Sequence, residues 1–242
     1  MSSVSQSRKL ILALDVPEHN SALEYVDKYS DYIDIFKVGL ELYTSCGPRI
    51  VEDIHKRGKK VFLDLKFHDI PNTVTKSSLA VARLGVHMFN LHASGGLEMM
   101  RRSMDSVVEF CLKQNMDRPK ILAVTVLTSL SREVLRDELG IQYGLRTHVR
   151  HLSALALKAG LDGVVASARE VEIIRNQCGK GFLIVTPGIR PSWTPPDDQK
   201  RTMTPKEAIR EGADYLVIGR GVLQQSDPVK AIELITLEII AA

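Results

Sequence analysis

Short runs of aliphatic and β-branched residues recur along the chain, and longer stretches of helical character separate them. Runs of this length and composition are typical of β-strands. The pattern predicts eight strands, over residues 9–16, 35–40, 59–67, 87–93, 120–127, 163–167, 182–189 and 215–222. Pro17 directly follows the first of these runs and marks its end.

Several segments between the predicted strands carry residues that start or stop helices. Gly58 stands where glycine commonly ends a helix, and Thr204 followed by Pro205 has the order of an N-cap and a first helical residue. Thr128 and Ser129 are suited to cap the helix after the fifth strand. We expect helices over residues 21–30, 46–57, 72–84, 96–114, 130–159 (interrupted near Gly140 and Gly144), 168–177, 204–211 and 227–240.

Eight strands that alternate with helices, without any linker-like stretch, predict one (β/α)8 barrel, an α/β fold that spans residues 1–242 as a single domain. The length of 242 residues agrees with the ~250 residues that are typical of this fold. The alternative is an open, doubly wound sheet. No G-x-G-x-x-G motif follows the first strand, and the barrel is therefore favoured.

Composition narrows the class of protein. The chain has 44% hydrophobic and 25% charged residues and a net charge of +3, values that are ordinary for a globular protein. No basic tract is interleaved with aromatic residues, and no apolar run reaches the ~20 residues of a membrane span, so we expect neither nucleic acid nor membrane as a partner. The polar segment 1–8 lacks the apolar core of a signal peptide, and Cys46, Cys111 and Cys178 are far apart, which predicts reduced thiols in the cytoplasm.

The third predicted strand carries charges where an apolar run is expected. Side chains on a strand point to alternate faces, so Asp64 and Lys66 share the face opposite Leu63, and Asp69 follows where the strand ends. A buried charge is costly unless it is paired. One interpretation is a structural ion pair between Asp64 and Lys66, and the other is an active site.

The strand ends of a barrel decide between these interpretations, because functional groups gather at the C-terminal ends of its strands. Polar residues at such positions are Asp15, Lys37, Asp64, Lys66, His92, Thr128, Ser167, Arg190 and Arg220. Asp15, Lys37 and the Asp64–Lys66 pair come from three consecutive strands and should therefore lie close together. Two lysines that alternate with two carboxylates favour an active site.

A second group of residues is suited to phosphate. Gly219, Arg220 and Gly221 end the eighth strand, and Arg190 ends the seventh. Barrels often bind phosphate with the loops after strands seven and eight, and arginine adds bidentate hydrogen bonds. The polar loop 191–201 is either a solvated surface loop or a lid whose Gln199, Lys200 or Arg201 reaches the phosphate.

The histidines suggest no metal site. His148 and His151 share a helix without a third ligand nearby in sequence, which favours a solvated pair. His92 and His68 lie near the charged strand, His92 as a possible hydrogen-bond partner of the site, and their roles stay open. No nucleophile elbow, P-loop or H-E-x-x-H motif is present.

The motif Asp64-x-Lys66-x-x-Asp69-Ile-Pro-Asn-Thr resembles the signature of the orotidine 5′-monophosphate decarboxylase family, in its bacterial branch. The resemblance covers nearly the whole chain: LALD at Asp15, FKVGLEL at Lys37, VTVLTS at Thr128, TPGIR at Arg190, DDQKR at Gln199 and VIGRG at Arg220. D-x-K-x-x-D alone is shared with Mg²⁺-dependent sugar-phosphate decarboxylases and synthases. Those relatives carry an acidic ligand where this chain has Lys37.

The resemblance implies decarboxylation of orotidine 5′-monophosphate to UMP and CO2, the last step of de novo UMP synthesis, without metal or cofactor. Lys66 would stabilise the carbanion at pyrimidine C6 and protonate it, and Asp64 would orient Lys66. Lys37 and Asp15 would hold ribose hydroxyls, with Lys37 also part of the catalytic charges.

The resemblance further implies that Thr128 meets the pyrimidine. The phosphate would be held by Gln199, Arg190, Gly219 and Arg220. Asp69, Ile70 and Thr73 would reach the site of a second subunit, which implies a homodimer with shared active sites. Two alternatives remain: a Mg²⁺-dependent sugar-phosphate enzyme and a phosphate-ligand-binding barrel without catalysis.

Overall fold

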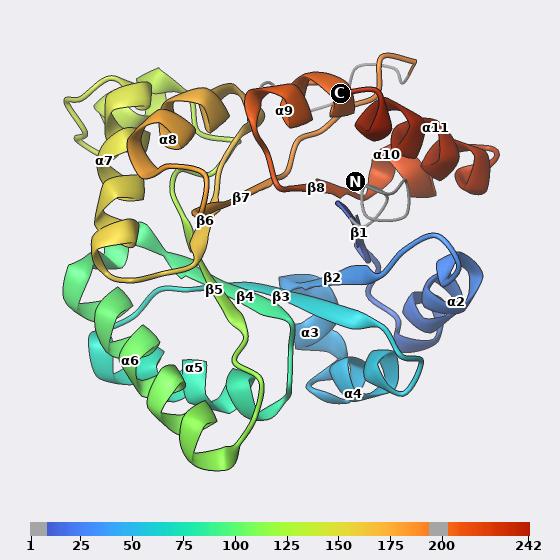
Figure 1. Cartoon of the computed structure of the whole chain (residues 1–242), viewed down its shortest axis with the longest axis horizontal. Helices are drawn as coiled ribbons and strands as arrows, with labels where there is room; N and C mark the ends of the chain where they lie inside the picture. Colours follow the sequence, from blue (N-terminus) through green and yellow to red (C-terminus); the bar gives the residue numbers. More distant parts are fainter. Residues whose placement is uncertain (1–8, 194–202) are drawn as a thin grey trace.

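The computed structural model describes residues 9–193 and 203–242, which form a closed barrel of eight parallel strands in chain order (Figure 1). The strands are β1 (Leu10–Ala13), β2 (Ile35–Gly39), β3 (Lys60–Phe67), β4 (Met88–His92), β5 (Lys120–Val124), β6 (Gly163–Val165), β7 (Leu183–Thr186) and β8 (Tyr215–Ile218). β1 pairs with both β2 and β8, which closes the ring. The prediction of a (β/α)8 barrel is confirmed, and an open sheet is excluded.

Helices surround this ring of strands, as Figure 1 shows. They are α2 (His19–Tyr29), α3 (Leu40–Cys46), α4 (Arg49–His55), α5 (Pro71–Arg83), α6 (Gly96–Gln114), α7 (Leu145–Lys158), α8 (Val171–Cys178), α9 (Pro205–Glu211), α10 (Arg220–Leu223) and α11 (Pro228–Ile240), with short turns η1 (Ala93–Gly95), η2 (Val134–Glu138) and η3 (Ala168–Glu170). Within the described ranges, no helix is both long and apolar enough to cross a membrane.

Alternation along the strands builds two apolar layers. Ile11, Ile35 and Phe62 belong to a small buried cluster to which every strand contributes, and this cluster fills the barrel interior. Leu12 and Phe36, one position further along, belong to the larger core between strands and helices. Both faces of the sheet are therefore covered, which explains why the strands are almost continuously apolar.

Two aspartates strengthen the N-terminal end of the barrel. Asp162, just before β6, accepts the Ile121 N–H at 2.8 Å and both terminal nitrogens of Arg118 at 2.6 and 2.7 Å. Asp214, just before β8, accepts the Ile184 N–H at 2.8 Å in the same way. These carboxylates join neighbouring strands at the end opposite to the predicted site.

Most predicted helices are confirmed, and α4 lies within the helix predicted over 46–57, but α3 is absent from the prediction. Helix α3 begins directly after β2 and ends at Cys46. Gly47 then has a φ of 65°, and Pro48 precedes α4, so the helical hydrogen bonds are interrupted between the two. The predicted break near Gly140 and Gly144 is confirmed, because α7 begins at Leu145 after the short π-helical turn η2.

Some predicted helix starts and strand ends are confirmed and others are wrong. Thr204 and Glu207 form a complete capping box at α9, which confirms the predicted N-cap. After β5, however, the Ser131 hydroxyl accepts the Val134 N–H at 3.4 Å, so Ser131 takes the capping role expected of Thr128 and Ser129. The predicted strand 215–222 ends at Ile218, because the residues from Arg220 onward form α10.

Candidate active site

Strand β3 pairs regularly with β4 up to Leu63 and irregularly beyond it, whereas its pairing with β2 stays regular through Asp64. Leu63 pairs with Phe89 of β4 and Phe67 with Leu91, so three β3 residues stand opposite the single residue Asn90. Lys66 has a φ of 54°, the left-handed conformation that side chains other than glycine rarely adopt. Such a conformation costs on the order of 1 kcal/mol or more and persists only where the surroundings enforce it.

The amide of Asn90 occupies the gap that this irregularity opens. Its Oδ1 accepts the backbone N–H of Lys66 at 2.8 Å, and its Nδ2 donates to Oδ1 of Asp64 at 2.7 Å. Asn90 is fully buried. It was not among the candidates from the sequence, although an asparagine within an apolar strand is a signal, because a buried amide needs hydrogen-bond partners.

Four charged side chains form an alternating array at the C-terminal ends of β1, β2 and β3. The Lys37 ammonium lies 3.0 Å from Oδ1 of Asp15 and 3.5 Å from Oδ2 of Asp64. The Lys66 ammonium lies 2.7 Å from Oδ1 of Asp64. The structure thus brings together the four charges that the barrel prediction places side by side.

Asp64 is the central carboxylate of this array and is buried. Its burial alone would raise its pKa, but the charges of Lys37 and Lys66 and the hydrogen bonds from Lys66 and Asn90 outweigh burial and lower the pKa. Asp64 is therefore a carboxylate at neutral pH. It accepts two of its hydrogen bonds at a single oxygen, which fixes its plane.

A cavity of about 160 Å³ lies beside the array. It is lined by Lys37, Phe62, Asp64, Lys66, Val124, Val126, Leu127, Thr128, Val165, Ala166, Pro187 and Val217. The charges stand on one side and apolar side chains on the others, with the Thr128 hydroxyl as a further polar group. Such a cavity suits a small group with apolar faces and an anionic substituent directed at the lysines.

The loops after β7 and β8 approach each other and the array. A Cβ on Gly219 would lie 2.9 Å from Oδ2 of Asp15 and 3.1 Å from Cβ of Ala13, so a side chain there would displace the Asp15 carboxylate. A Cβ on Gly221 would lie 3.8 Å from Cδ of Pro191, the residue after Arg190. Arg190 and Arg220 thus both follow the C-terminal ends of neighbouring strands.

The phosphate contacts themselves stay predictions. Gln199, Lys200 and Arg201 lie outside the described residues. Arg220 is exposed at the start of α10. The backbone N–H of Arg190 donates to the Met203 carbonyl at 2.9 Å, which anchors the start and end of the intervening loop to each other.

Three predicted residues stand apart from the array of their own chain. Asp69, Ile70 and Thr73 are exposed around the start of α5, and 65% of the Ile70 surface is accessible. The Asp69 carboxylate accepts the Ile70 N–H at 2.7 Å. Within residues 9–193 and 203–242, no ion pair connects Asp69 to either lysine of the array.

The histidines near the site form a pair. The rings of His68 and His92 have centroids 5.2 Å apart. Burial, with smaller contributions from His68 and Lys66, lowers the pKa of His92 to about 4, so His92 is neutral at pH 7.

Ser167, another polar residue at a strand end, accepts the Arg169 N–H at 3.4 Å and thus caps η3. Among the described residues, no group of three or more His, Cys, Asp or Glu side chains could hold a metal ion.

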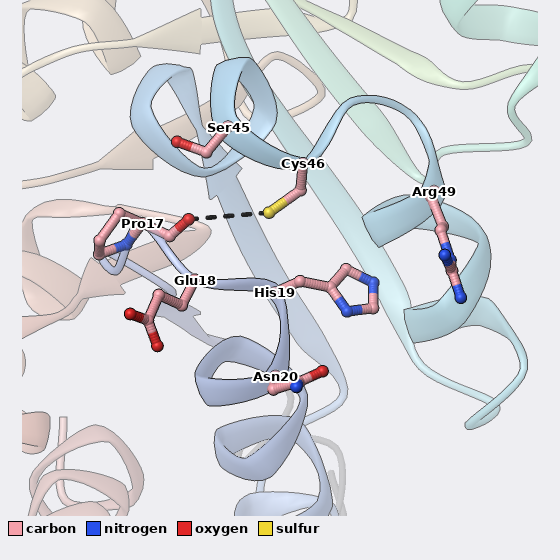
Figure 2. A pocket seen from close by; sticks show the side chains of 7 residues that line it. All are labelled: Pro17, Glu18, His19, Asn20, Ser45, Cys46 and Arg49. Atoms are coloured by element: carbon pink, nitrogen blue, oxygen red, sulfur yellow. Dashed lines mark hydrogen bonds between the residues drawn. The ribbon is translucent and has the colours of Figure 1, made fainter.

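A larger cavity of about 560 Å³ lies between the start of α2 and the junction of α3 and α4 (Figure 2). Figure 2 shows the Cys46 thiol turned toward the Pro17 carbonyl, 3.7 Å away. The basic side chains of this cavity already have a partner, since His19 and Arg49 lie 3.0 and 3.5 Å from Asp53. The smaller cavity beside the array is therefore the better candidate for chemistry.

The chain is similar to known proteins over nearly its full length. Residues 8–235 match the Orotidine 5′-phosphate decarboxylase / HUMPS family. The chain is 52% identical over 235 residues to the Orotidine 5′-phosphate decarboxylase of Pelobacter propionicus, covering 97% of this chain and 96% of the relative. The protein of the same name from Geobacter sulfurreducens is 53% identical over 234 residues, covering 96% of each. A crystal structure of Orotidine 5′-phosphate decarboxylase from Lactobacillus acidophilus is 36% identical, with a TM-score of 0.84 and coverage of 96% of this chain and 99% of that one.

Proposed function

The chain belongs to the Orotidine 5′-phosphate decarboxylase / HUMPS family and is a carboxy-lyase, and we propose that it converts orotidine 5′-monophosphate to UMP and CO2 by direct protonation from a lysine. The observation that carries this proposal is the array Asp15–Lys37–Asp64–Lys66 beside an apolar cavity. It is the arrangement that a reaction with a developing carbanion requires.

The substrate is held by groups on three sides of the barrel mouth. Arg190, Gly219 and Arg220 bind the phosphate, together with Gln199, which lies outside the described residues. Arginine forms bidentate, charge-assisted hydrogen bonds to phosphate. Asp15 and Lys37 hold the ribose hydroxyls, and the Thr128 hydroxyl meets the pyrimidine within the cavity.

The chemical step is the heterolytic loss of CO2. The bond between C6 and the carboxylate breaks, and its electron pair stays on C6, where no ring carbonyl is placed to accept the charge as an enolate. The Lys66 ammonium stabilises this carbanion electrostatically in a site with little water. Lys66 then transfers a proton to C6, which gives UMP, and the neutral amine takes up a proton from solvent.

Asp64 and Lys37 contribute to the reaction by holding the Lys66 ammonium in place. Asp64 lies 2.7 Å from the Lys66 ammonium and directs it toward C6, and the Lys37 ammonium, 3.5 Å from the other oxygen of Asp64, balances the buried charge. Since the phosphate contacts are far from the breaking bond, their binding energy is available to assemble the site around the pyrimidine.

We further propose a homodimer with shared active sites, in which Asp69, Ile70 and Thr73 complete the site of the partner subunit. In support, these residues are exposed and Asp69 contacts neither lysine of its own array within the described ranges. Leu40, after β2, is also 55% exposed, so apolar surface is available at the same end of the barrel. A location in the cytoplasm, in de novo UMP synthesis, belongs to the same proposal.

Two other functions are distinguishable from this one. A Mg²⁺-dependent sugar-phosphate decarboxylase or synthase needs an acidic ligand where Lys37 stands, and the Lys37 ammonium is paired with both neighbouring carboxylates. A phosphate-ligand-binding barrel without catalysis would bind UMP without consuming orotidine 5′-monophosphate. An ultraviolet assay of orotidine 5′-monophosphate consumption, run with EDTA and again after addition of Mg²⁺, together with a measurement of UMP binding, separates the three.

A further inference from the structure

We propose that Asn90 is a positioning residue for the decarboxylation, and that its amide holds Asp64 and Lys66 in the geometry that the reaction needs. The inference rests on the proposed function, because it assigns a role within the same site. It extends the site to β4, from which the array takes no charged group.

Asn90 connects the two halves of the central ion pair through two different bonds. One bond, from its Nδ2 to the Asp64 carboxylate, acts on a side chain, whereas the other, from the Lys66 N–H to its Oδ1, acts on the backbone. The distance between the Lys66 backbone and the Asp64 carboxylate is therefore set by one rigid, planar amide.

The backbone bond replaces a strand hydrogen bond that the irregular pairing removes. Asn90 alone faces the three β3 residues from Asp64 to Lys66, and Lys66 is held at a φ of 54°. Without Asn90 the part-buried Lys66 N–H would lose its acceptor, and an unpaired donor in the protein interior is unfavourable. The strand would then relax toward ordinary pairing and the ammonium would move.

The two hydrogen bonds made by the Asn90 side chain require an amide. One end of the side chain must donate to a carboxylate and the other must accept from an N–H, and asparagine offers both at a fixed separation. An alanine at position 90 offers neither. An ionised aspartate would accept from Lys66 but would place a second negative charge against Asp64.

The two hydrogen bonds of Asn90, here called the Asn90 bridge, affect the geometry of Asp64 and Lys66 and not the residues that bind the phosphate. Arg190, Arg220 and Gly219 follow β7 and β8, on the other side of the barrel from β4. Loss of the bridge should therefore lower kcat and leave KM nearly unchanged. A displacement of about 1 Å at a reacting group can cost on the order of 100-fold in rate.

The first test compares Asn90→Ala with a matched control, Met88→Ala. Met88 lies two positions earlier on β4, is equally buried and packs in the barrel interior without a polar contact to the array. For Asn90→Ala we expect kcat to fall about 100-fold, with KM and UMP affinity within about 3-fold of wild type. For Met88→Ala we expect a lower melting temperature, but a kcat within about 3-fold. An Asn90→Ala kcat within 3-fold of wild type would overturn the proposal.

The second test uses Asn90→Asp and does not depend on how well Asn90→Ala folds. The new carboxyl is buried beside Asp64, so its pKa should be raised. Once protonated, it can again donate to Asp64 and accept the Lys66 N–H, as the amide does. The kcat of Asn90→Asp relative to wild type should therefore rise as the pH falls from about 8 to 5.5. If the ratio of the kcat of folded Asn90→Asp to that of wild type does not change with pH, the proposed role of the two Asn90 hydrogen bonds is wrong.

The wild-type protein distinguishes this inference from the proposed function. If wild type does not consume orotidine 5′-monophosphate although it binds UMP, the proposed function fails and the role of Asn90 in decarboxylation fails with it. If wild type turns over and both Asn90 variants behave like Met88→Ala, only the inference about Asn90 is wrong.

Discussion

The Lys66 ammonium lies 2.7 Å from the Asp64 carboxylate, although the two residues belong to a segment of β3 that has lost its regular pairing with β4. The left-handed backbone at Lys66 and the amide of Asn90 accompany this contact. The ion pair is therefore not a simple result of alternation along a strand. It is held from two sides, by Lys37 and by Asn90.

The proposed phosphate-binding site is testable with Arg220→Ala. A hydrogen bond to a charged group contributes about 1.5–3 kcal/mol, so KM for orotidine 5′-monophosphate should rise about 10- to 150-fold, with a smaller change in kcat. Arg210→Ala, an exposed arginine on α9, is the control and should behave like wild type. Calorimetry with UMP and uridine adds a second comparison. Equal loss of affinity for both ligands would place the phosphate site elsewhere.

Shared active sites predict that two inactive variants restore each other. In a mixed dimer of Lys66→Ala and Asp69→Ala, the subunit that keeps Lys66 receives an intact Asp69 from its partner. Co-refolded variants should regain up to about a quarter of wild-type activity when random pairing makes half of the dimers mixed. If each chain uses its own Asp69, the mixture stays inactive, and light scattering of a monomer would also exclude the shared site.

The barrel end opposite to the site should matter for stability and not for catalysis. Asp162→Ala leaves the Arg118 guanidinium and the Ile121 N–H without their partner, which should cost about 2–3 kcal/mol of unfolding free energy. Asp137→Ala breaks a fully exposed pair with Arg136 and should leave the free energy of unfolding almost unchanged. Urea denaturation measures both values. A large loss of kcat in folded Asp162→Ala would contradict this separation.

The neutral state of His92 predicts a pH dependence of stability. Its pKa is lowered to about 4 in the folded protein, so the unfolded chain takes up the proton more readily as the pH falls below the ordinary value of 6.5. The pKa difference corresponds to roughly 3 kcal/mol, and because the ring is partly exposed, solvent screening reduces the expected loss of stability between pH 6.5 and pH 4 to roughly 1–2 kcal/mol. His92→Gln should reduce that slope. An unchanged slope in His92→Gln would show that His92 is not the cause.

Much of the fold follows from the sequence, because apolar strands that alternate with amphipathic helices have few stable arrangements. The charges stand out for the same reason: Lys37, Asp64 and Lys66 interrupt strands that are otherwise apolar. Once the barrel is assumed, their proximity follows from the order of the strands.

The details of the site do not follow from alternation. A period of two assumes regular pairing, whereas β3 loses its register beside Asn90. The role of Asn90 depends on which β4 residue faces Lys66, and that register cannot be read from either strand alone. Helix α3 is also absent from the prediction, because its first residue, Leu40, continues the apolar run of β2.

The role of Lys66 is the centre of the proposed mechanism. Lys66→Ala removes the group that stabilises and protonates the carbanion, so kcat should fall at least about 1000-fold. Lys113→Ala, an exposed lysine on α6, is the control. Circular dichroism and UMP binding should show that both variants fold. Activity of Lys66→Ala close to wild type would rule out the assigned role.

The most direct measurement follows the loss of orotate absorbance when purified wild-type protein is mixed with orotidine 5′-monophosphate in EDTA. We predict rapid and complete conversion to UMP, the same rate after addition of Mg²⁺, and no detectable conversion by Lys66→Ala. Absence of turnover by wild type, or turnover that appears only with Mg²⁺, would contradict the proposed function.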